Sequence, residues 1–188
     1  INVADFLNDL SEKSLIIFDE EKVRYRMLES IKQYGEDRLK EANGSNKIAD
    51  AHIKYFEKAV MIADKELYGS GTTEVLRFFD DEASNMERAF LHAMEKHEFE
   101  AAANISLSMV EYRKLRGQFS EGLEWLEKVH EYKAEVSDRT FNNLILKIGS
   151  IYQLKADMNK AREFVTASLE FNRRIGDKSG IAGSLIIL

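Results

Sequence analysis

The sequence predicts a mainly α-helical protein in which pairs of helices stack on one another, preceded by a small module with one β-hairpin. Three observations support this prediction. Apolar residues recur every three or four positions over most of the 188 residues. The sequence contains no proline, the residue that most strongly interrupts a helix. A related stretch of sequence also occurs twice, with an offset of about 40 residues.

The chain begins with a predicted helix and a predicted hairpin. Apolar residues have helical spacing over residues 3–10. An apolar run at 15–18 is followed by polar residues at 19–22, and apolar and basic residues then alternate over 23–27. Two such segments around a polar turn are typical of a β-hairpin.

A second helix is expected over residues 28–42, and Gly44 is expected to end it in the left-handed conformation. A short helix, a hairpin and a helix together are typical of the end of a winged-helix domain. Residues 1–44 are therefore predicted to form a partial winged-helix module.

Residues 45–98 are predicted to form connecting helices. A helix is expected over 48–68, and the segment 69–73 (GSGTT) has the composition of a loop. After that loop we expect a short helix at 74–79 and a separate helix at 80–96.

Residues 99–188 are predicted to consist of repeated helix pairs, the last of them truncated. Helices are expected over 99–115, 119–134 and 179–188. Two further helices are expected within 140–174, separated by a polar break at 155–157. Aligning RGQFSEGLEWLEKV with KADMNKAREFVTAS places Gly122 on Ala161. Trp125 and Tyr132 are expected to belong to the core between stacked helices.

The helices of 140–174 resemble the tetratricopeptide repeat. Gly149, Tyr152 and Ala161 stand where that pattern has glycine, tyrosine and alanine, and Gly122 takes the alanine position in the preceding unit. Small residues at these positions let the two helices approach closely. The resemblance implies a right-handed α-solenoid, although aliphatic residues replace two aromatic positions of the pattern and its closing proline is missing.

A second resemblance covers nearly the whole chain. The strings LSEKSLIIF and VRYRMLESIKQYGEDRL, within residues 10–39, resemble the winged-helix segment of bacterial STAND-type ATPase regulators, including the AfsR-like and LuxR-type transcription activators. Later strings such as RGQFSEGLEWLEKV and IGDKSGIAGSL resemble the repeat region of the same proteins. The sequence begins with Ile1 and ends within an apolar helical pattern, so it is expected to be a piece of a longer protein.

The resemblance implies a non-catalytic sensor and interaction arm in the cytoplasm of a bacterium. In this interpretation, a protein or a small inducer binds the repeat surface and controls a nucleotide switch upstream of Ile1. ATP or ADP would bind that upstream module, and no cofactor is expected in these residues. Two alternatives remain: a stand-alone tetratricopeptide scaffold without a nucleotide switch, and a DNA-binding winged helix with a repeat tail.

The sequence suggests no catalytic residues and no metal ligands. It contains no cysteine, and His92 and His97 are five residues apart, so they point to different faces of a helix. The GSGTT segment lacks the lysine that a phosphate-binding loop requires after its second glycine. No apolar run approaches the roughly 20 residues of a membrane helix. The net charge of −6 also argues against a nucleic-acid surface along the whole chain.

Five residues are candidates for interactions: Arg24, Arg26, Arg113, Asn142 and Lys155. Arg24 and Arg26 belong to a local basic cluster that could contact DNA phosphates. They could instead keep the edge of the hairpin from pairing with other strands. The STAND resemblance implies that they face the nucleotide module, so direct binding of DNA by these residues is not expected. A salt-dependent loss of DNA affinity on replacing both arginines with alanine would contradict that assignment.

Overall fold

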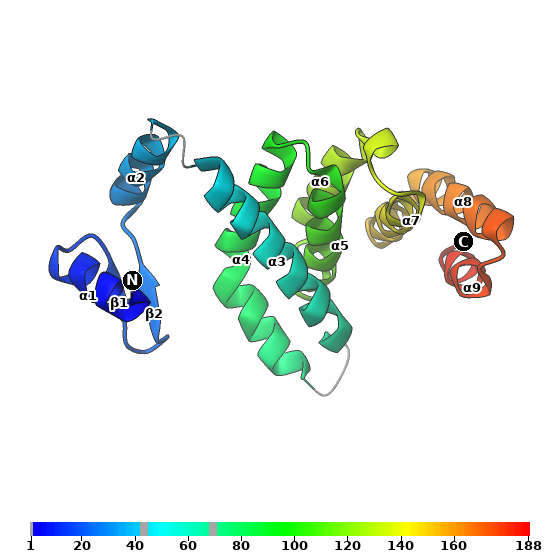
Figure 1. Ribbon diagram of the computed structural model, residues 1–188. Coiled ribbons are helices and arrows are strands. Elements are labelled where there is room, and N and C mark those ends of the chain that lie inside the picture. Colours follow the sequence, from blue (N-terminus) through cyan, green and yellow to red (C-terminus); the bar gives the residue numbers. More distant parts are fainter. Residues whose placement is uncertain (1, 42–44, 68–70) are drawn as a thin grey trace. The chain divides into compact units, whose positions relative to one another are not determined.

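The computed structural model describes residues 2–41, 45–67 and 71–188. These residues form nine α-helices, one short 3-10 helix and one two-stranded antiparallel sheet (Figure 1). The predictions of a mainly helical fold and of a single hairpin near the N-terminus are confirmed. The chain divides into two compact units, residues 1–49 and 50–188, and each is described by itself.

The first unit contains α1 (Val3–Glu12), β1 (Ile17–Asp19), β2 (Arg24–Arg26) and α2 (Glu29–Glu41). Its hairpin pairs Ile17 with Arg26, Phe18 with Tyr25 and Asp19 with Arg24. The Lys22 backbone N–H donates to the Asp19 carboxylate (3.1 Å) and helps to close the turn. The predicted left-handed cap at Gly44 lies outside the described residues.

The first unit buries little apolar surface. Among its described side chains, only Ile16 is a buried apolar one, at 6% exposed. Val3, Phe6 and Val23 are more than half exposed. A unit of about 50 residues with so small a core is not expected to be stable alone.

The second unit is a stack of helices. It contains most of α3 (Ser45–Glu66), followed by α4 (Thr72–Glu95), α5 (Phe99–Leu115), α6 (Phe119–His130), the 3-10 helix (Lys133–Glu135), α7 (Asp138–Leu154), α8 (Met158–Ile175) and α9 (Lys178–Ile187). From α4 onward each α-helix packs against the next one in the chain (Figure 1). In addition, α5 contacts α7 and α7 contacts α9, so alternate helices lie in one row.

A single hydrophobic core runs through the described helices of this unit from α3 to α8. Trp125 is 7% exposed and stacks on Phe90, with the ring centroids 4.3 Å apart. The interpretation of Trp125 as a core residue is therefore confirmed. Tyr132 is at the edge of the core, because it is 36% exposed but stacks on the buried ring of Phe99 at 4.0 Å.

Four turns between helices have the same geometry. Each contains one residue in the left-handed conformation, and these residues are His97 (φ 59°), Gly117 (74°), Ala156 (60°) and Gly176 (70°). After each of them, the next backbone N–H donates to the carbonyl oxygen five residues earlier, as from Gln118 to Arg113 (2.8 Å). This is the Schellman arrangement, which satisfies the last carbonyl groups of a helix. The four residues are separated by 20, 39 and 20 positions, so the turns recur with the helix pairs.

Two predicted boundaries are wrong. The predicted loop extends to residue 73, but α4 already begins at Thr72. The short helix predicted at 74–79 and the separate helix predicted at 80–96 are both parts of this single helix. No glycine or proline interrupts it, and Phe79, Met86 and Phe90 form one continuous buried stripe. The helix expected to reach Ala134 ends at His130, because the chain turns there and Tyr132 stacks on Phe99.

None of the described helices combines the length and the hydrophobicity needed to cross a membrane.

Candidate functional site

A groove of about 420 Å³ runs across three helices of the second unit. We name it the α3/α5/α7 groove. Its lining residues are Met61, Asp64 and Lys65 of α3, Asn104, Leu107, Ser108 and Glu111 of α5, and Asn143, Leu146 and Lys147 of α7. Apolar side chains thus alternate with amides and charged groups along the groove.

Two pairs of lining residues occupy equivalent positions on α5 and α7. Asn104 and Asn143 are 39 residues apart, and so are Leu107 and Leu146. This is also the separation of the turns at Gly117 and Ala156. The two helices therefore present the same amide and the same apolar side chain to the groove, one repeat apart.

The two amides differ in their hydrogen bonds. The Asn104 amide donates to the Glu57 carboxylate (2.8 Å), which fixes the orientation of its side chain. Asn143 is exposed and has no hydrogen-bond partner among the described residues. An asparagine amide carries both donors and an acceptor, so Asn143 can bind a peptide group at two points.

The groove lining includes one buried carboxylate, that of Glu111 on α5, which is bonded to Lys147 of α7. Glu111 is 4% exposed and accepts from Lys147 (2.5 Å) with one oxygen and from Lys114 (2.7 Å) with the other. Both lysines are therefore held to α5. A buried carboxylate of this kind requires such partners, because leaving it unpaired would cost several kcal/mol.

Asp64 of α3 faces the same charges. Burial raises the pKa of Asp64, Lys147 lowers it and Glu111 raises it again. Asp64 has no ion pair and no side-chain hydrogen bond among the described residues. It is therefore an exposed carboxylate of the groove lining on which both Lys147 and Glu111 act electrostatically.

The interaction residues predicted on the repeats do not line this groove. The Arg113 guanidinium stacks over Trp125 at 4.0 Å and donates to the Glu121 carbonyl oxygen (2.9 Å). Lys155 directly follows the C-terminal end of α7, and its ammonium donates to the Ser120 hydroxyl of α6 (3.0 Å). Both side chains form contacts between neighbouring helices.

Asn142 is buried, at 6% exposed. Its amide donates to Asn172 (3.0 Å), and its carbonyl oxygen accepts from Ser168 (2.8 Å). Its hydrogen bonds are therefore made inside the helix stack, between α7 and α8. The next residue, Asn143, is the one that lines the groove.

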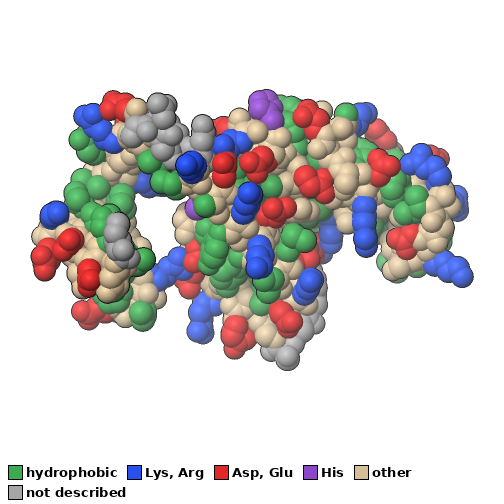
Figure 2. All heavy atoms as spheres, viewed as in Figure 1, with side chains coloured by type: hydrophobic (Ala, Val, Ile, Leu, Met, Phe, Trp, Pro, Cys, Tyr) green, Lys and Arg blue, Asp and Glu red, His purple; other side chains and the backbone are tan. Residues whose placement is uncertain are grey.

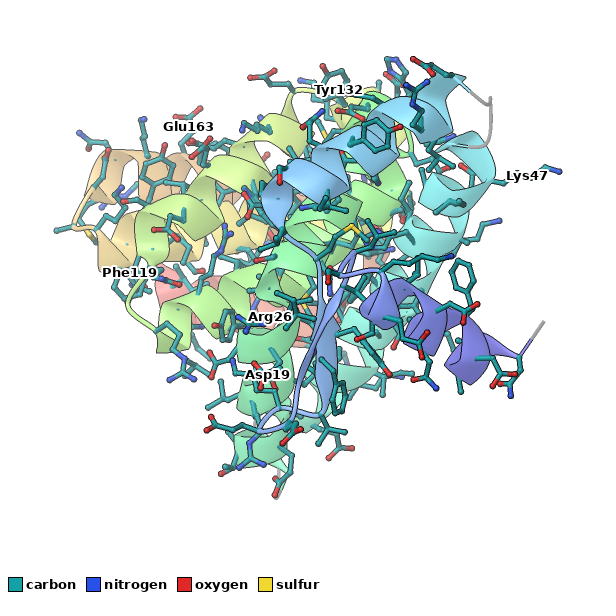
Figure 3. The ribbon with its side chains drawn as sticks, turned by 90° about the vertical axis from the view of Figure 1, so that its left-hand side faces the viewer. Asp19, Arg26, Lys47, Phe119, Tyr132 and Glu163 are labelled. Atoms are coloured by element: carbon teal, nitrogen blue, oxygen red, sulfur yellow. The ribbon has the colours of Figure 1, made fainter. Side chains whose placement is uncertain are left out.

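Arg24 and Arg26 lie on β2 of the other unit. Arg26 forms an ion pair with Asp19 (3.5 Å), and both residues are labelled on the hairpin in Figure 3. Arg24 is half-buried opposite Asp19 in the strand register. The carboxylate of Asp19 thus offsets part of the positive charge that the sequence places here.

The residues of the repeat pattern lie at helix–helix contacts. A Cβ atom added to Gly149 would be 2.5 Å from Val165, and one added to Gly122 would be 2.8 Å from Val110. Ala161 is 3% exposed. The helix–helix contacts at Gly149 and Gly122 therefore have no space for larger side chains at these two positions.

Tyr152 joins α7 to its neighbours. Its hydroxyl donates to Glu127 and accepts from Lys160 (3.0 Å). Burial raises the pKa of Tyr152, and the bond to the Glu127 carboxylate raises it further. The tyrosine therefore stays protonated at neutral pH and acts as a structural hydrogen-bond donor.

The charged side chains are mixed in sign. On the face shown in Figure 2, acidic and basic groups are interspersed over the helices of the second unit and form no large area of one sign. The described residues contain no group of three or more metal-ligating side chains that could hold an ion.

Comparison of the chain with protein-family models, with curated proteins and with solved structures gives no match. The geometry of the groove is therefore the main source of functional inference. One sequence signal could have identified it: the alignment that relates Gly122 to Ala161 also relates Asn104 to Asn143 when it is extended to the first helix of each pair.

Proposed function

We propose that this chain is a non-catalytic recognition element that binds an extended peptide segment in the α3/α5/α7 groove. The observation that carries the proposal is the repetition of Asn104 and Leu107 as Asn143 and Leu146 on the next helix of the same row. Equivalent side chains at a regular spacing suit a ligand that is itself regular, such as the backbone of an extended peptide.

The proposed fold behind this function is a right-handed tetratricopeptide-like solenoid. Its support is the recurrence of four identical turns and the contact of alternate helices, α5 with α7 and α7 with α9. In such a stack the first helix of each pair lines one side. The groove-lining helices α5 and α7 are the first helices of the two related pairs.

The chemistry of the lining fits a peptide better than an ion or a nucleotide. Asn143 supplies a donor and an acceptor to one peptide group. Leu107, Leu146 and Met61 supply apolar contact for side chains. Main-chain hydrogen bonds would give affinity, and the apolar positions would select among sequences.

We further propose that the chain is the sensor arm of a bacterial regulator of the STAND type. The support is the resemblance of residues 10–39 to the winged-helix segment of those proteins, and the small core of the unit 1–49. A partial winged helix would gain its missing core by packing on a nucleotide-binding module, which would hold ATP or ADP. Ligand binding in the groove would then shift that module between two states, to the extent that the ligand prefers one of them.

The groove proposal is tested by selecting peptides from a random 12-residue library on the immobilised 188-residue chain. We expect selected peptides to bind the parent chain and to lose at least tenfold in affinity with Leu146→Asp, because a charge would then lie in the apolar part of the groove. The matched control is Leu154→Asp, an exposed leucine two turns along the same helix. Equal affinity for the two variants would overturn the proposal.

The regulator proposal is tested separately, by peptide mass mapping of the intact native protein. An upstream Gly-x-x-x-x-Gly-Lys-Ser/Thr sequence is expected, since this loop binds nucleotide phosphates. A start methionine directly before Ile1, with no such loop, would contradict the switch and would favour a stand-alone scaffold.

A further inference from the structure

The side chains that repeat in the α3/α5/α7 groove form two rows. One row consists of Asn104 of α5 and Asn143 of α7, and the other consists of Leu107 and Leu146. Within each helix the two residues are three positions apart, so the rows are separated by about 4.5 Å along the helix axes. Both leucines are half-buried, so part of each side chain is open to a ligand.

The packing of α5 on α7 sets the period of these rows. The two helices are in direct contact. The axes of packed helices lie about 8–10 Å apart, so each row places identical groups at about this interval. A ligand that uses both rows therefore needs equivalent groups with the same period.

Neither a β-strand nor an α-helix meets this requirement. A strand advances about 3.3 Å per residue and its side chains alternate between two faces, so groups on one face recur at about 6.6 Å or 13 Å. An α-helix presents side chains on one face at a comparable interval, about 10.5 Å after seven residues. Its peptide groups are already hydrogen-bonded to one another, so they are not free to bind the Asn143 amide.

The polyproline II conformation has the required period. This left-handed helix has three residues per turn and rises about 3.1 Å per residue, so side chains on one face recur at about 9.3 Å. It has no internal hydrogen bonds, so its peptide groups are available to side-chain amides. Its backbone can therefore follow the asparagine row while every third side chain contacts the leucine row.

We infer that the groove binds a peptide in the polyproline II conformation with apolar side chains at positions i and i+3. One of them contacts Leu107 and the other contacts Leu146. The inference rests on the proposed function and adds the conformation of the ligand and the spacing of its apolar residues. The groove lining holds two carboxylates and two ammonium groups, so neither sign of charge is selected.

The asparagine row binds the backbone of the same peptide. Asn143 offers its whole amide to one peptide group. Asn104 keeps an acceptor and one donor after its bond to Glu57, so it binds the equivalent peptide group one turn away. A polyproline II segment is already ordered before it binds, so little conformational entropy is lost.

The spacing is tested on peptides selected from the random 12-residue library with the 188-residue chain. The selected sequences should share two apolar residues separated by two others. Copies of each peptide carry the second apolar residue at i+2 or at i+4 instead. Fluorescence anisotropy should show at least tenfold weaker binding of both copies, because the moved side chain points away from the leucine row. Copies that bind as well as the selected peptide would overturn the inference.

Double-mutant cycles test which leucine each apolar residue contacts. Leu107→Ala and Leu146→Ala are each combined with an alanine at position i or at position i+3 of the peptide. Each leucine should be coupled to one peptide residue, and the two leucines to different ones. Coupling of both leucines to the same peptide residue would contradict the assignment.

The matched controls for these cycles are Leu115→Ala and Leu154→Ala. These two exposed leucines lie outside the groove lining on α5 and α7, and they are also 39 residues apart. They should be coupled to neither peptide residue. Circular dichroism of all four variants checks that the helices are intact.

Proline tests the conformation separately from the spacing. Its ring fixes φ near −65°, close to the polyproline II value. At one or both of the positions between the apolar residues, proline should bind as well as the selected residue or better. A loss of at least tenfold at both positions would show that the bound peptide has another conformation.

The outcomes separate the two proposals. If no selected peptide is sensitive to Leu146→Asp, the proposed function itself fails. If sensitive peptides bind but carry their apolar residues at alternate positions, or become helical on binding, only the inference about polyproline II is overturned.

Discussion

The helix pairs α5/α6 and α7/α8 fill the same contact in opposite ways. In α5/α6 the first helix carries the larger residue, Val110, which packs against Gly122 of the second helix. In α7/α8 the first helix carries Gly149, and the second helix supplies Val165 and the backbone of Ala161. Val110 and Gly149 are equivalent positions, 39 residues apart. The comparison shows that the fold requires a fixed total volume at this contact, and that either helix can supply the larger side chain.

A second pair of equivalent positions follows the same rule. In α5/α6 the flat guanidinium of Arg113 stacks on Trp125 at 4.0 Å. At the corresponding positions of α7/α8, Tyr152 stacks on Phe164 at 6.0 Å with nearly parallel rings. The contact therefore requires a flat group on an aromatic ring, and both a cation and a phenol meet that requirement.

The largest expected effect comes from filling the smaller side of the α7/α8 contact. Gly149→Leu should lower the free energy of unfolding by about 3 kcal/mol or more, as over-packing of a close helix contact does. The first added carbon alone would lie 2.5 Å from Val165 and 3.3 Å from the Ala161 carbonyl oxygen. Urea denaturation measures the loss. The control is Gly183→Leu, because no atom lies within 4 Å of a Cβ at that position. Equal stability of the two variants would mean that α7 and α8 do not approach closely at Gly149.

A double-mutant cycle tests whether volume is shared between the helices of α5/α6. Gly122→Ala should cost about 1–2 kcal/mol, because its Cβ would lie 2.8 Å from a Val110 methyl group. Val110→Ala should then cost about 1 kcal/mol less in the Gly122→Ala background than alone, since the new methyl group occupies part of the vacated space. Additive effects in urea denaturation would show that the two residues do not share one volume.

The sequence predicts the helices of the second unit better than it predicts the groove. Helical spacing of apolar residues and the polar break around Ala156 are local signals, and they locate α7 and α8 closely. The end of α6 is set by the stacking of Tyr132 on Phe99. These two residues are more than 30 positions apart in the sequence, so no local pattern encodes their contact. The continuity of α4 is likewise decided by its buried stripe, which overrides the polar sequence around Asp80.

The choice between Asn142 and Asn143 shows why the site could not be located from one helix alone. Adjacent residues on a helix point about 100° apart, so one of them can be buried while the other faces a groove. Only the packing of α7 on α8 fixes this orientation, and it places the Asn142 amide against Ser168 and Asn172. The repeat of Asn104 is the sequence signal that selects Asn143 instead.

The two helix pairs also differ at their N-terminal ends, which leads to a prediction about pH. On α5, Glu100 accepts hydrogen bonds from the Ser137 backbone N–H (2.7 Å) and from the Thr140 hydroxyl (2.5 Å), and so caps α7. The equivalent residue on α7 is Arg139, which cannot accept such bonds, and α9 is capped by its own Asp177. The N-terminus of α7 thus depends on a carboxylate from the preceding helix pair, whereas that of α9 does not depend on Arg139.

Burial on its own would raise the pKa of Glu100, but the bonds from Thr140 and Ser137 outweigh it and lower the pKa below its usual value. A lowered pKa in the folded state stabilises the protein above the unfolded value of about 4.3, and this contribution is lost as the pH falls through the folded pKa. Glu100→Gln should therefore lower stability at pH 7 and have a smaller effect near pH 3. The exposed Glu131→Gln is the control in urea denaturation at both pH values. A Glu100→Gln effect of equal size at both would contradict a role for the charge.

The smallest expected effects lie at the turns and should have opposite signs in the two pairs. Gly117 and Ala156 are equivalent, and both adopt the left-handed conformation (φ 74° and 60°). Alanine is strained there by roughly 1 kcal/mol, whereas glycine is not. Ala156→Gly should therefore raise the free energy of unfolding by about 0.5 kcal/mol, after the greater freedom of glycine in the unfolded chain is subtracted. Gly117→Ala should lower it by about 0.5 kcal/mol, because the strain of alanine is partly offset by the lower freedom of alanine in the unfolded chain. A Cβ at Gly117 would meet no atom within 4 Å, so no clash adds to this loss. If both changes lowered the stability measured by thermal unfolding, the two turns would not share one backbone conformation, and the correspondence of the two helix pairs would end at their helices.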